Sequence, residues 1–190
     1  FSLKWCEEAA KIGYAPAQSN LGILYLRGES VKKSTKKGIN LLTKAAEQDH
    51  LLSFYNLGVA YEDMAEIRKS EVYRIYAIRW YERASLRGNR KSMLYLGRML
   101  NDVANTHEDL KKAHMWVNIS MAIKCADDKL ACKWSREMFE GPSKKSTKQL
   151  WDLRIKIERK LPPNVIKEAH DLAQELIISN KYIKEQLSLK

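Results

Sequence analysis

Hydrophobic residues along this chain recur at helical spacing. Around Leu21, Leu57 and Leu96, apolar side chains return three or four residues apart, the spacing that places them on one face of an α-helix. The segment 77–84 follows the same pattern, with its apolar residues again on one helical face. The pattern predicts an all-α protein.

Three sequence features recur in one phase, with steps of 36 and then 39 residues. Because independent features share even the irregular step, we interpret the chain as an array of repeats. The three extra residues are placed in the connection 64–76. The features are a Leu-Gly pair (Leu21-Gly22, Leu57-Gly58, Leu96-Gly97), a large apolar residue (Trp5, Leu41, Trp80, Trp116) and a small pair (Ala9-Ala10, Ala45-Ala46, Ala84-Ser85).

Each Leu-Gly pair places a glycine inside a predicted helix, where glycine costs about 1 kcal/mol relative to alanine. We therefore expect Gly22, Gly58 and Gly97 to lie where a β-carbon would collide with a neighbouring helix. The small pairs are expected to form the matching surface. Each repeat is thus predicted to be an antiparallel helical hairpin, with its Trp and Tyr residues, Trp5 included, packed in the core.

Turn signals and a change of pattern divide the chain. Gly13 and Gly88 follow predicted helices, and 27–31 forms a turn, as expected at helix C-termini. After residue 141 the repeat pattern ends. Helices are predicted over 148–160 and, after Pro162-Pro163, over 164–179, with a tail 180–190 that frays or extends the last helix. Because a solenoid exposes an apolar end, we expect a repeat array over 1–141 and capping helices over 142–190 in the same domain.

Two stretches carry a resemblance to a known family. Residues 17–31, AQSNLGILYLRGESV, resemble the Sel1-like repeat signature. KAHMW at 112–116 resembles the family's Lys-Ala-x-x-Trp helix start, and YAIRW at 76–80 is a looser copy. The segment 160–173 is similar to the closing helix of many bacterial members, which suggests a bacterial source. The resemblance covers roughly residues 1–140.

The resemblance implies an all-α, right-handed α-solenoid of antiparallel helix pairs, related to tetratricopeptide arrays and closed by a C-terminal capping helix pair. In such arrays the Leu-Gly helix lines the concave side. The chain departs from the family at Gly38, where alanine is usual, and at Cys132-Lys133, which replaces a Leu-Gly pair. The first repeat is therefore expected to be incomplete and the last one degenerate.

The same phase selects candidate partner-binding residues. Positions two before each Leu, and one and four after each Gly, point outward from the predicted concave side. Tyr, Arg and Trp, the types enriched at interface hot spots, are among them; the alternative is that the apolar residues only pack against the neighbouring repeat. The residues are Ser19, Ile23, Leu26, Tyr55, Val59, Glu62, Leu94, Arg98, Asn101, Leu130 and Trp134.

Charge narrows the class of partner. Lys and Arg number 34 against 23 Asp and Glu, a formal net charge of +11. This surplus suits an acidic protein, an anionic lipid surface or nucleic acid, and is also compatible with ordinary solubility. The basic segments 32–37 and 143–160 lack the interleaved aromatic side chains that nucleic-acid binding favours, and no apolar run is long enough to span a membrane. A protein partner is therefore expected, with nucleic acid and membrane disfavoured.

Catalytic signals are weak. His50, His107, His114 and His170 fall in different units, and none lies in a nucleophile motif. No short-spaced set of Cys and His ligands and no phosphate-binding loop occurs. We therefore expect no catalytic residue, no metal site and no cofactor.

The cysteines bear on one enzymatic alternative. Some cysteine-rich members of the family pair the helices of each unit by disulfides and have been linked to β-lactam binding or hydrolysis. Here Cys6, Cys125 and Cys132 do not recur in every unit. Free thiols are therefore expected, with a Cys125–Cys132 disulfide as the alternative.

The preferred function is a scaffold or adaptor that binds a protein, including an immunity or inhibitor protein. The alternatives are a β-lactam-binding or hydrolysing enzyme and a basic-surface binder of anionic lipid or nucleic acid. Because residues 1–5 already show a helix-interior pattern, the sequence is expected to be truncated, and its compartment stays open.

Overall fold

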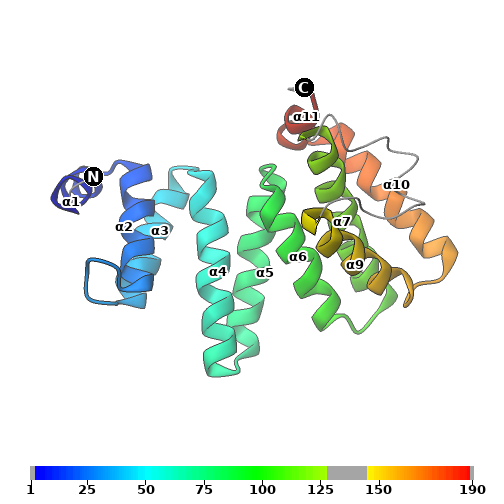
Figure 1. Ribbon diagram of the computed structural model, residues 1–190, viewed down its shortest axis with the longest axis horizontal. Coiled ribbons are helices and arrows are strands. Elements are labelled where there is room, and N and C mark those ends of the chain that lie inside the picture. The colour runs from blue at the N-terminus through cyan, green and yellow to red at the C-terminus, as the bar shows by residue number, and fades with distance from the viewer. Residues whose placement is uncertain (1–2, 128–144, 189–190) are drawn as a thin grey trace. The chain divides into compact units, whose positions relative to one another are not determined.

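A computed structural model describes residues 3–127 and 145–188, and every regular element in these ranges is a helix (Figure 1). The chain divides into two compact units, Phe1–Ala84 and Ser85–Lys190. The predicted boundary at 141/142 falls outside the described ranges and stays a prediction.

Helices of unit 1 pack against their neighbours in sequence order. The helix α2 contacts α1 and α3, and α3 contacts α4, so the unit is built of antiparallel helix pairs (Figure 1). The last two residues of α5 belong to unit 2. The helices are α1 (Leu3–Lys11), α2 (Ala15–Arg27), α3 (Thr35–Glu47), α4 (Leu51–Arg68) and α5 (Glu71–Leu86).

The predicted stops between helices are confirmed. Gly13, Gly28 and Gly88 adopt φ values of +93°, +76° and +83°, the left-handed conformation that favours glycine. At the end of α2, the N–H of Gly28 donates to the carbonyl of Leu24 at 2.8 Å. These residues end their helices as predicted.

The helix-interior glycines lie at close helix contacts, as predicted. A β-carbon on Gly22 would lie 2.9 Å from Leu42 Cγ and 3.1 Å from the carbonyl oxygen of Gly38. A β-carbon on Gly58 would lie 2.5 Å from the ring of Tyr81. Contacts below 3.0 Å are essentially never made by real β-carbons, so alanine at either site would force the facing side chain or its helix to shift.

Unit 2 repeats the arrangement at Gly97, whose β-carbon would lie 2.6 Å from Val117 and 3.2 Å from the carbonyl oxygen of Ala113. The residues that fill the space at the three glycines stand in one repeat phase: Leu42, Tyr81 and Val117. The small residues at these contacts are Gly38 and Ala113, so the prediction that the recurring small pairs meet the glycines is wrong. Ala10, Ala45, Ala46, Ala84 and Ser85 are instead buried elsewhere at the helix contacts.

The three extra residues of the second repeat lengthen its helices. Helix α4 has 18 residues where α2 has 13, and α5 has 16 where α3 has 13. The insertion is therefore absorbed by regular helix, and only Lys69 and Ser70 separate α4 from α5.

Trp5 departs from the sequence prediction. Its side chain is 73% exposed, whereas Trp116, in the same repeat phase, is 4% exposed. Helix α1 packs on α2, and no helix of the described residues precedes α1 to cover its other side. The prediction of a core role for Trp5 is therefore wrong in this structure.

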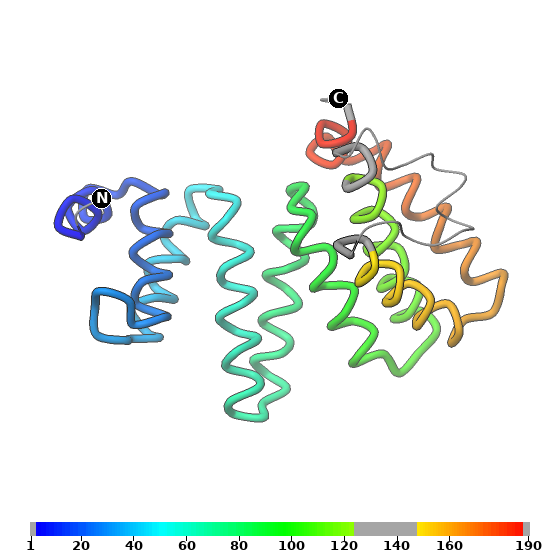
Figure 2. The backbone as a smooth tube through the Cα atoms, viewed as in Figure 1, coloured from blue at the N-terminus to red at the C-terminus, as the bar shows by residue number. Residues whose placement is uncertain are grey.

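In unit 2 the helices after the array close its apolar end. Both α9 and α10 pack on α7 (Figure 2), and Leu150 and Ile157 of α9 join Val117 of α7 in one buried cluster. The predicted capping helix pair is confirmed. The helices are α6 (Arg90–Val103), α7 (His107–Asp127), α9 (Lys145–Glu158), α10 (Pro163–Ser179) and α11 (Lys181–Ser188).

The C-terminal tail forms a separate helix, α11, rather than a frayed end. Ile183 is fully buried, and the Asn180 side chain donates to the carbonyl of Leu86 at 2.9 Å. The backbone of Tyr182 lies against Gly88, where a β-carbon would come within 3.1 Å of its carbonyl oxygen. None of the described helices is long and apolar enough to cross a lipid bilayer.

Candidate functional site

The Leu-Gly helices of unit 1, α2 and α4, contact each other. The predicted residues Ile23 and Leu26 on α2 and Tyr55 on α4 pack against one buried cluster, centred on Leu42 and Leu57, and remain partly exposed. Val59 and Glu62 on α4 are also partly exposed. We call Ile23, Leu26, Tyr55, Val59 and Glu62 the α2–α4 face. Ser19 is 1% exposed and offers no side-chain surface to a partner.

Two members of the α2–α4 face also hold α4 against α5. The rings of Tyr55 and Tyr81 are 6.1 Å apart between centroids, and the Tyr81 hydroxyl donates to Glu62 Oε2 at 2.6 Å. Because Tyr81 is fully buried, these contacts hold the Tyr55 ring and the Glu62 carboxylate in place. Tyr55 and Glu62 therefore pack within unit 1 and are also predicted to contact a partner.

In unit 2 the predicted positions differ in accessibility. Arg98 is exposed, with its guanidinium 4.8 Å from the centre of the Tyr95 ring. Leu94 is half-buried against the cluster that includes Leu110.

Asn101 is 3% exposed, and its Oδ1 accepts from Lys160 Nζ at 3.0 Å. Asn101 is thus a buried link to the segment after α9. Leu130 and Trp134 lie outside the described residues, as do Cys132 and the side chain of Cys125.

Unit 2 also contains a buried polar cluster that sequence reasoning missed. His114, on α7, is fully buried; its Nε2 lies 2.8 Å from Glu158 Oε1 and its Nδ1 lies 3.0 Å from Asn118 Nδ2. Arg154 Nε donates to the same oxygen of Glu158 at 2.7 Å. The ring of His170, on α10, meets that of His114 edge-on with centroids 5.1 Å apart. The cluster joins three helices.

The protonation behaviour of the cluster follows from its contacts. Burial raises the pKa of Glu158, but hydrogen bonds from His114 and Arg154 outweigh it and lower the pKa to about 2. Burial lowers the pKa of His170, and the neighbouring His114 and Arg154 lower it further. Glu158 is therefore ionised at neutral pH, and protonation of His170 is disfavoured in the folded chain.

The geometry of the cluster suits a structural role. Each ring nitrogen of His114 is within hydrogen-bond distance of a protein group, so neither is open to a substrate. Among residues 3–127 and 145–188, no group of three or more His, Cys, Asp and Glu side chains is placed to hold a metal ion. His50, at the start of α4, contacts Ser53 Oγ through Nδ1 at 2.9 Å. No local sequence signal reveals the cluster, because His114 and Glu158 are 44 residues apart and the members come from α7, α9 and α10.

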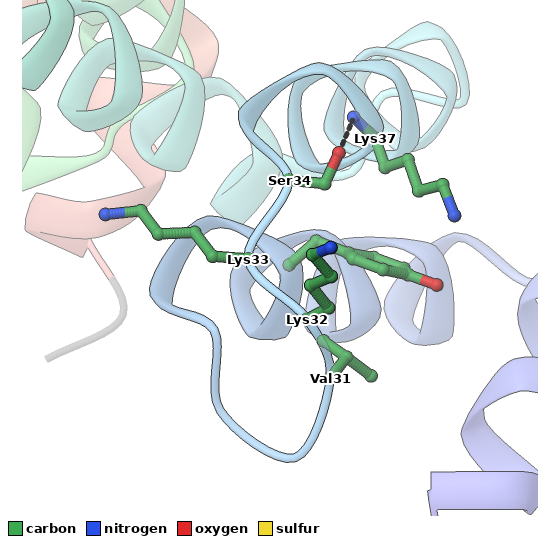
Figure 3. Close-up of a pocket in the computed structure, with 6 residues that line it drawn as sticks. Val31, Lys32, Lys33, Ser34 and Lys37 are labelled. Atoms are coloured by element: carbon green, nitrogen blue, oxygen red, sulfur yellow. Dashed lines mark hydrogen bonds between the residues drawn. The ribbon is translucent and has the colours of Figure 1, made fainter.

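A second feature of unit 1 is a basic pocket of about 420 Å³ at the connection between α2 and α3 (Figure 3). In the sequence, segment 32–37 is one of two basic segments that lack interleaved aromatic side chains. In the structure three of its lysines border one hollow together with Tyr25, which the sequence assigned to the core. Its lining residues are Tyr25, Val31, Lys32, Lys33, Ser34 and Lys37.

Comparisons with known proteins agree with the helix-pair architecture. The Sel1 repeat family model matches residues 15–50 and 55–89. No curated protein matches the chain.

Two solved structures resemble the fold. A protective antigen present in uropathogenic Escherichia coli strains, displaying an SLR fold, is 22% identical with a TM-score of 0.54; the match covers 98% of this chain and 42% of that one. A Sel1 repeat protein from Oxalobacter formigenes is 18% identical with a TM-score of 0.54, covering 91% of this chain and 78% of that one. The chain thus spans less than half the length of the first of these proteins. The family model and the helix pairs together show that this chain is an all-α solenoid that contains Sel1 repeats, at residues 15–50 and 55–89.

Proposed function

We propose that this chain is a protein-binding scaffold that holds its partner on the α2–α4 face. Sel1 repeat proteins generally mediate protein–protein interactions. The observation that supports this face is a set of four half-buried apolar or aromatic side chains on two contacting helices. Ile23, Leu26, Tyr55 and Val59 lie among buried positions and still present surface.

The chemistry of the face suits a protein rather than a small molecule. Tyrosine at the edge of an apolar strip is enriched at interface hot spots, and Glu62 adds a fixed carboxylate held by Tyr81. Fixed side chains lose little conformational entropy on binding. Arg98 of unit 2, and Leu130 and Trp134 outside the described residues, stay predictions from the sequence and are not part of this face.

The test compares charge insertions on the face with the same change elsewhere. A partner is first isolated by affinity capture and purified, and its binding to Ile23→Asp and Val59→Asp is measured by calorimetry. We expect each variant to bind at least about tenfold more weakly, because a buried, unpaired carboxylate at an interface costs more than about 1.4 kcal/mol. Ile12, 86% exposed in the turn directly after α1, provides the control Ile12→Asp.

Equal weakening by Ile12→Asp, or unchanged affinity of both face variants, would contradict the proposal. Circular dichroism of each variant establishes that the helices are retained. The repeat fold is typically a non-enzymatic interaction scaffold, and a β-lactam turnover assay on the purified chain tests the catalytic alternative; hydrolysis would count against a purely binding role.

A further inference from the structure

The basic pocket between α2 and α3 has a charge pattern that the α2–α4 face does not share. Of its six lining residues three are lysines and none is acidic. Val31 and the half-buried Tyr25 supply apolar wall. Such a lining favours an anionic group with aliphatic or aromatic surface beside it.

The loop that carries the lysines is held in place by backbone contacts. Ser34 N–H donates to the carbonyl of Tyr25 at 2.8 Å. Gly28, with φ +76°, lies so close to Lys33 that a β-carbon would be 3.0 Å from Lys33 Cβ. The backbone of this loop is therefore held in place without a ligand, which lowers the entropic cost of binding.

The lysine side chains around the pocket point in different directions. Lys33 extends away from Lys37 (Figure 3), and its charge acts on Asp63 of α4: burial and Glu66 raise the pKa of Asp63, and Lys33 opposes them. Lys37 Nζ lies 5.3 Å from the centre of the Tyr25 ring. Lys32 and Lys37 are thus the ammonium groups available to a ligand beside Tyr25.

The N-terminus of α3 does not supply the positive charge of the pocket. Ser34 Oγ accepts from the Lys37 N–H at 3.4 Å, so the helix end is already capped by its own side chain. The positive charge of the pocket comes from its lysine side chains.

The next repeat fills the equivalent space with aromatic rings. By the repeat phase, Tyr61 corresponds to Tyr25, and Tyr76 to Lys37. The rings of Tyr61 and Tyr76 are 5.3 Å apart, and Tyr73 stacks on Tyr61 at 6.3 Å. The second repeat therefore closes this space with tyrosine rings. The first repeat has lysines around an open hollow at the equivalent place.

We propose that this pocket binds a carboxylate side chain of an acidic segment of the partner protein, with Lys32 and Lys37 as the charge partners and Tyr25 as the apolar wall. This inference rests on the proposed protein-binding function and names the chemistry of the partner. A protein carboxylate is favoured over a nucleic acid because Tyr25 is half-buried rather than an open surface on which bases could stack. The formal net charge of +11 brings an acidic segment toward the chain.

The test uses a fluorescein-labelled hexaglutamate peptide and the full 190-residue chain, followed by fluorescence anisotropy at low salt. The double variant Lys32→Ala/Lys37→Ala should lower the affinity about five- to tenfold, within the range for two exposed ion pairs. The matched control Lys11→Ala/Lys44→Ala removes the same charge from exposed positions of α1 and α3 and should change the affinity less than about twofold.

A carbodiimide coupling identifies the lysines that meet the peptide. The reagent activates a peptide carboxylate, a lysine Nζ displaces it to form an amide, and the reagent leaves as its urea. We expect amides at Lys32 or Lys37 in excess over Lys11 and Lys44.

Two outcomes of the hexaglutamate assay would overturn the inference: no binding at low salt, or equal weakening by both double variants. A third would come from a single-stranded oligonucleotide used as a second probe: Lys32→Ala/Lys37→Ala weakens its binding but leaves hexaglutamate binding unchanged. The last would assign the lysines to nucleic acid. Because the assay uses no isolated partner and leaves Ile23 and Val59 intact, its failure is distinguishable from failure of the proposed α2–α4 face.

Discussion

The ring of Tyr81 occupies the space that the β-carbon of any other residue at Gly58 would require. Two ring carbons lie 2.5 Å from that position, and the ring cannot withdraw easily because its hydroxyl is bonded to Glu62 and its side chain is fully buried. The same relationship joins Gly22 to Leu42 and Gly97 to Val117. The repeat is therefore defined by a pair of positions on two helices, not by the glycine alone.

Gly58→Ala should destabilise the chain despite the higher helix propensity of alanine. Forcing an extra methyl group into a packed core costs about 1–3 kcal/mol, and the propensity gain offsets about 1 kcal/mol. We expect the free energy of unfolding in urea to fall by up to about 2 kcal/mol. Combining it with Tyr81→Leu, the residue type at position 42, should cost less than the sum of the single changes; additive costs would show that the ring is not the obstacle.

Gly28→Ala tests whether the pocket loop is built around a left-handed residue. Alanine at φ +76° is strained by about 1–2 kcal/mol, and its β-carbon would press on Lys33. We expect a lower thermal midpoint together with weaker hexaglutamate binding. A variant of normal stability and normal binding would mean that the loop conformation does not position the lysines.

Glu158→Gln should destabilise unit 2. The change removes the charge that Arg154, 8% exposed, and His114 both contact, and hydrogen bonds to charged groups contribute about 1.5–3 kcal/mol. We expect a loss of about 2 kcal/mol at neutral pH. The loss should shrink in acid, because a carboxyl with a lowered pKa stabilises the fold above its unfolded pKa of 4.5 and loses that effect as pH falls toward about 2. A difference between variant and wild type that does not change with pH would contradict this role of the Glu158 charge.

His170 predicts a second pH dependence of stability, at higher pH than the one that Glu158 causes. Its folded pKa lies below the unfolded value of 6.5 because of burial, His114 and Arg154, while Glu158 and Asp171 act in the opposite direction. The unfolded chain therefore binds more protons as pH falls, and stability is lost below about pH 6.5. His170→Phe keeps an aromatic ring beside His114 and should flatten the profile between about pH 7.5 and about pH 5. Urea titrations across this range measure it; identical slopes in both proteins would exclude His170 as the cause.

The fold was predictable from the sequence because the residues that form each helix contact recur at equivalent positions of the repeats. Gly22, Gly58 and Gly97 share one phase, and all three lie at close helix contacts. The partner positions were misassigned, since Leu42, Tyr81 and Val117 differ in size and only geometry shows that they fill the same place. Trp5 was misassigned because a repeat phase does not say whether a neighbouring helix covers that face.

Functional features were less predictable because they depend on distant contacts. His114, Glu158 and His170 come from three helices and carry no local motif. The basic pocket was hidden because Tyr25 obeys the core pattern and the lysines resemble an ordinary solvated loop. Ser19 and Asn101 were assigned outward by phase, yet both are buried, since a helix face in a solenoid is flanked by neighbours on both sides.

Binding of a partner protein to the α2–α4 face is tested most directly by site-specific photo-crosslinking in cells. A benzophenone amino acid is placed at Val59 on the face and, as the matched control, at Lys44, which is exposed on α3. We expect light to produce a discrete cross-linked protein from position 59 and none from position 44. The same product from both positions, or a product from position 44 alone, would contradict binding at this face.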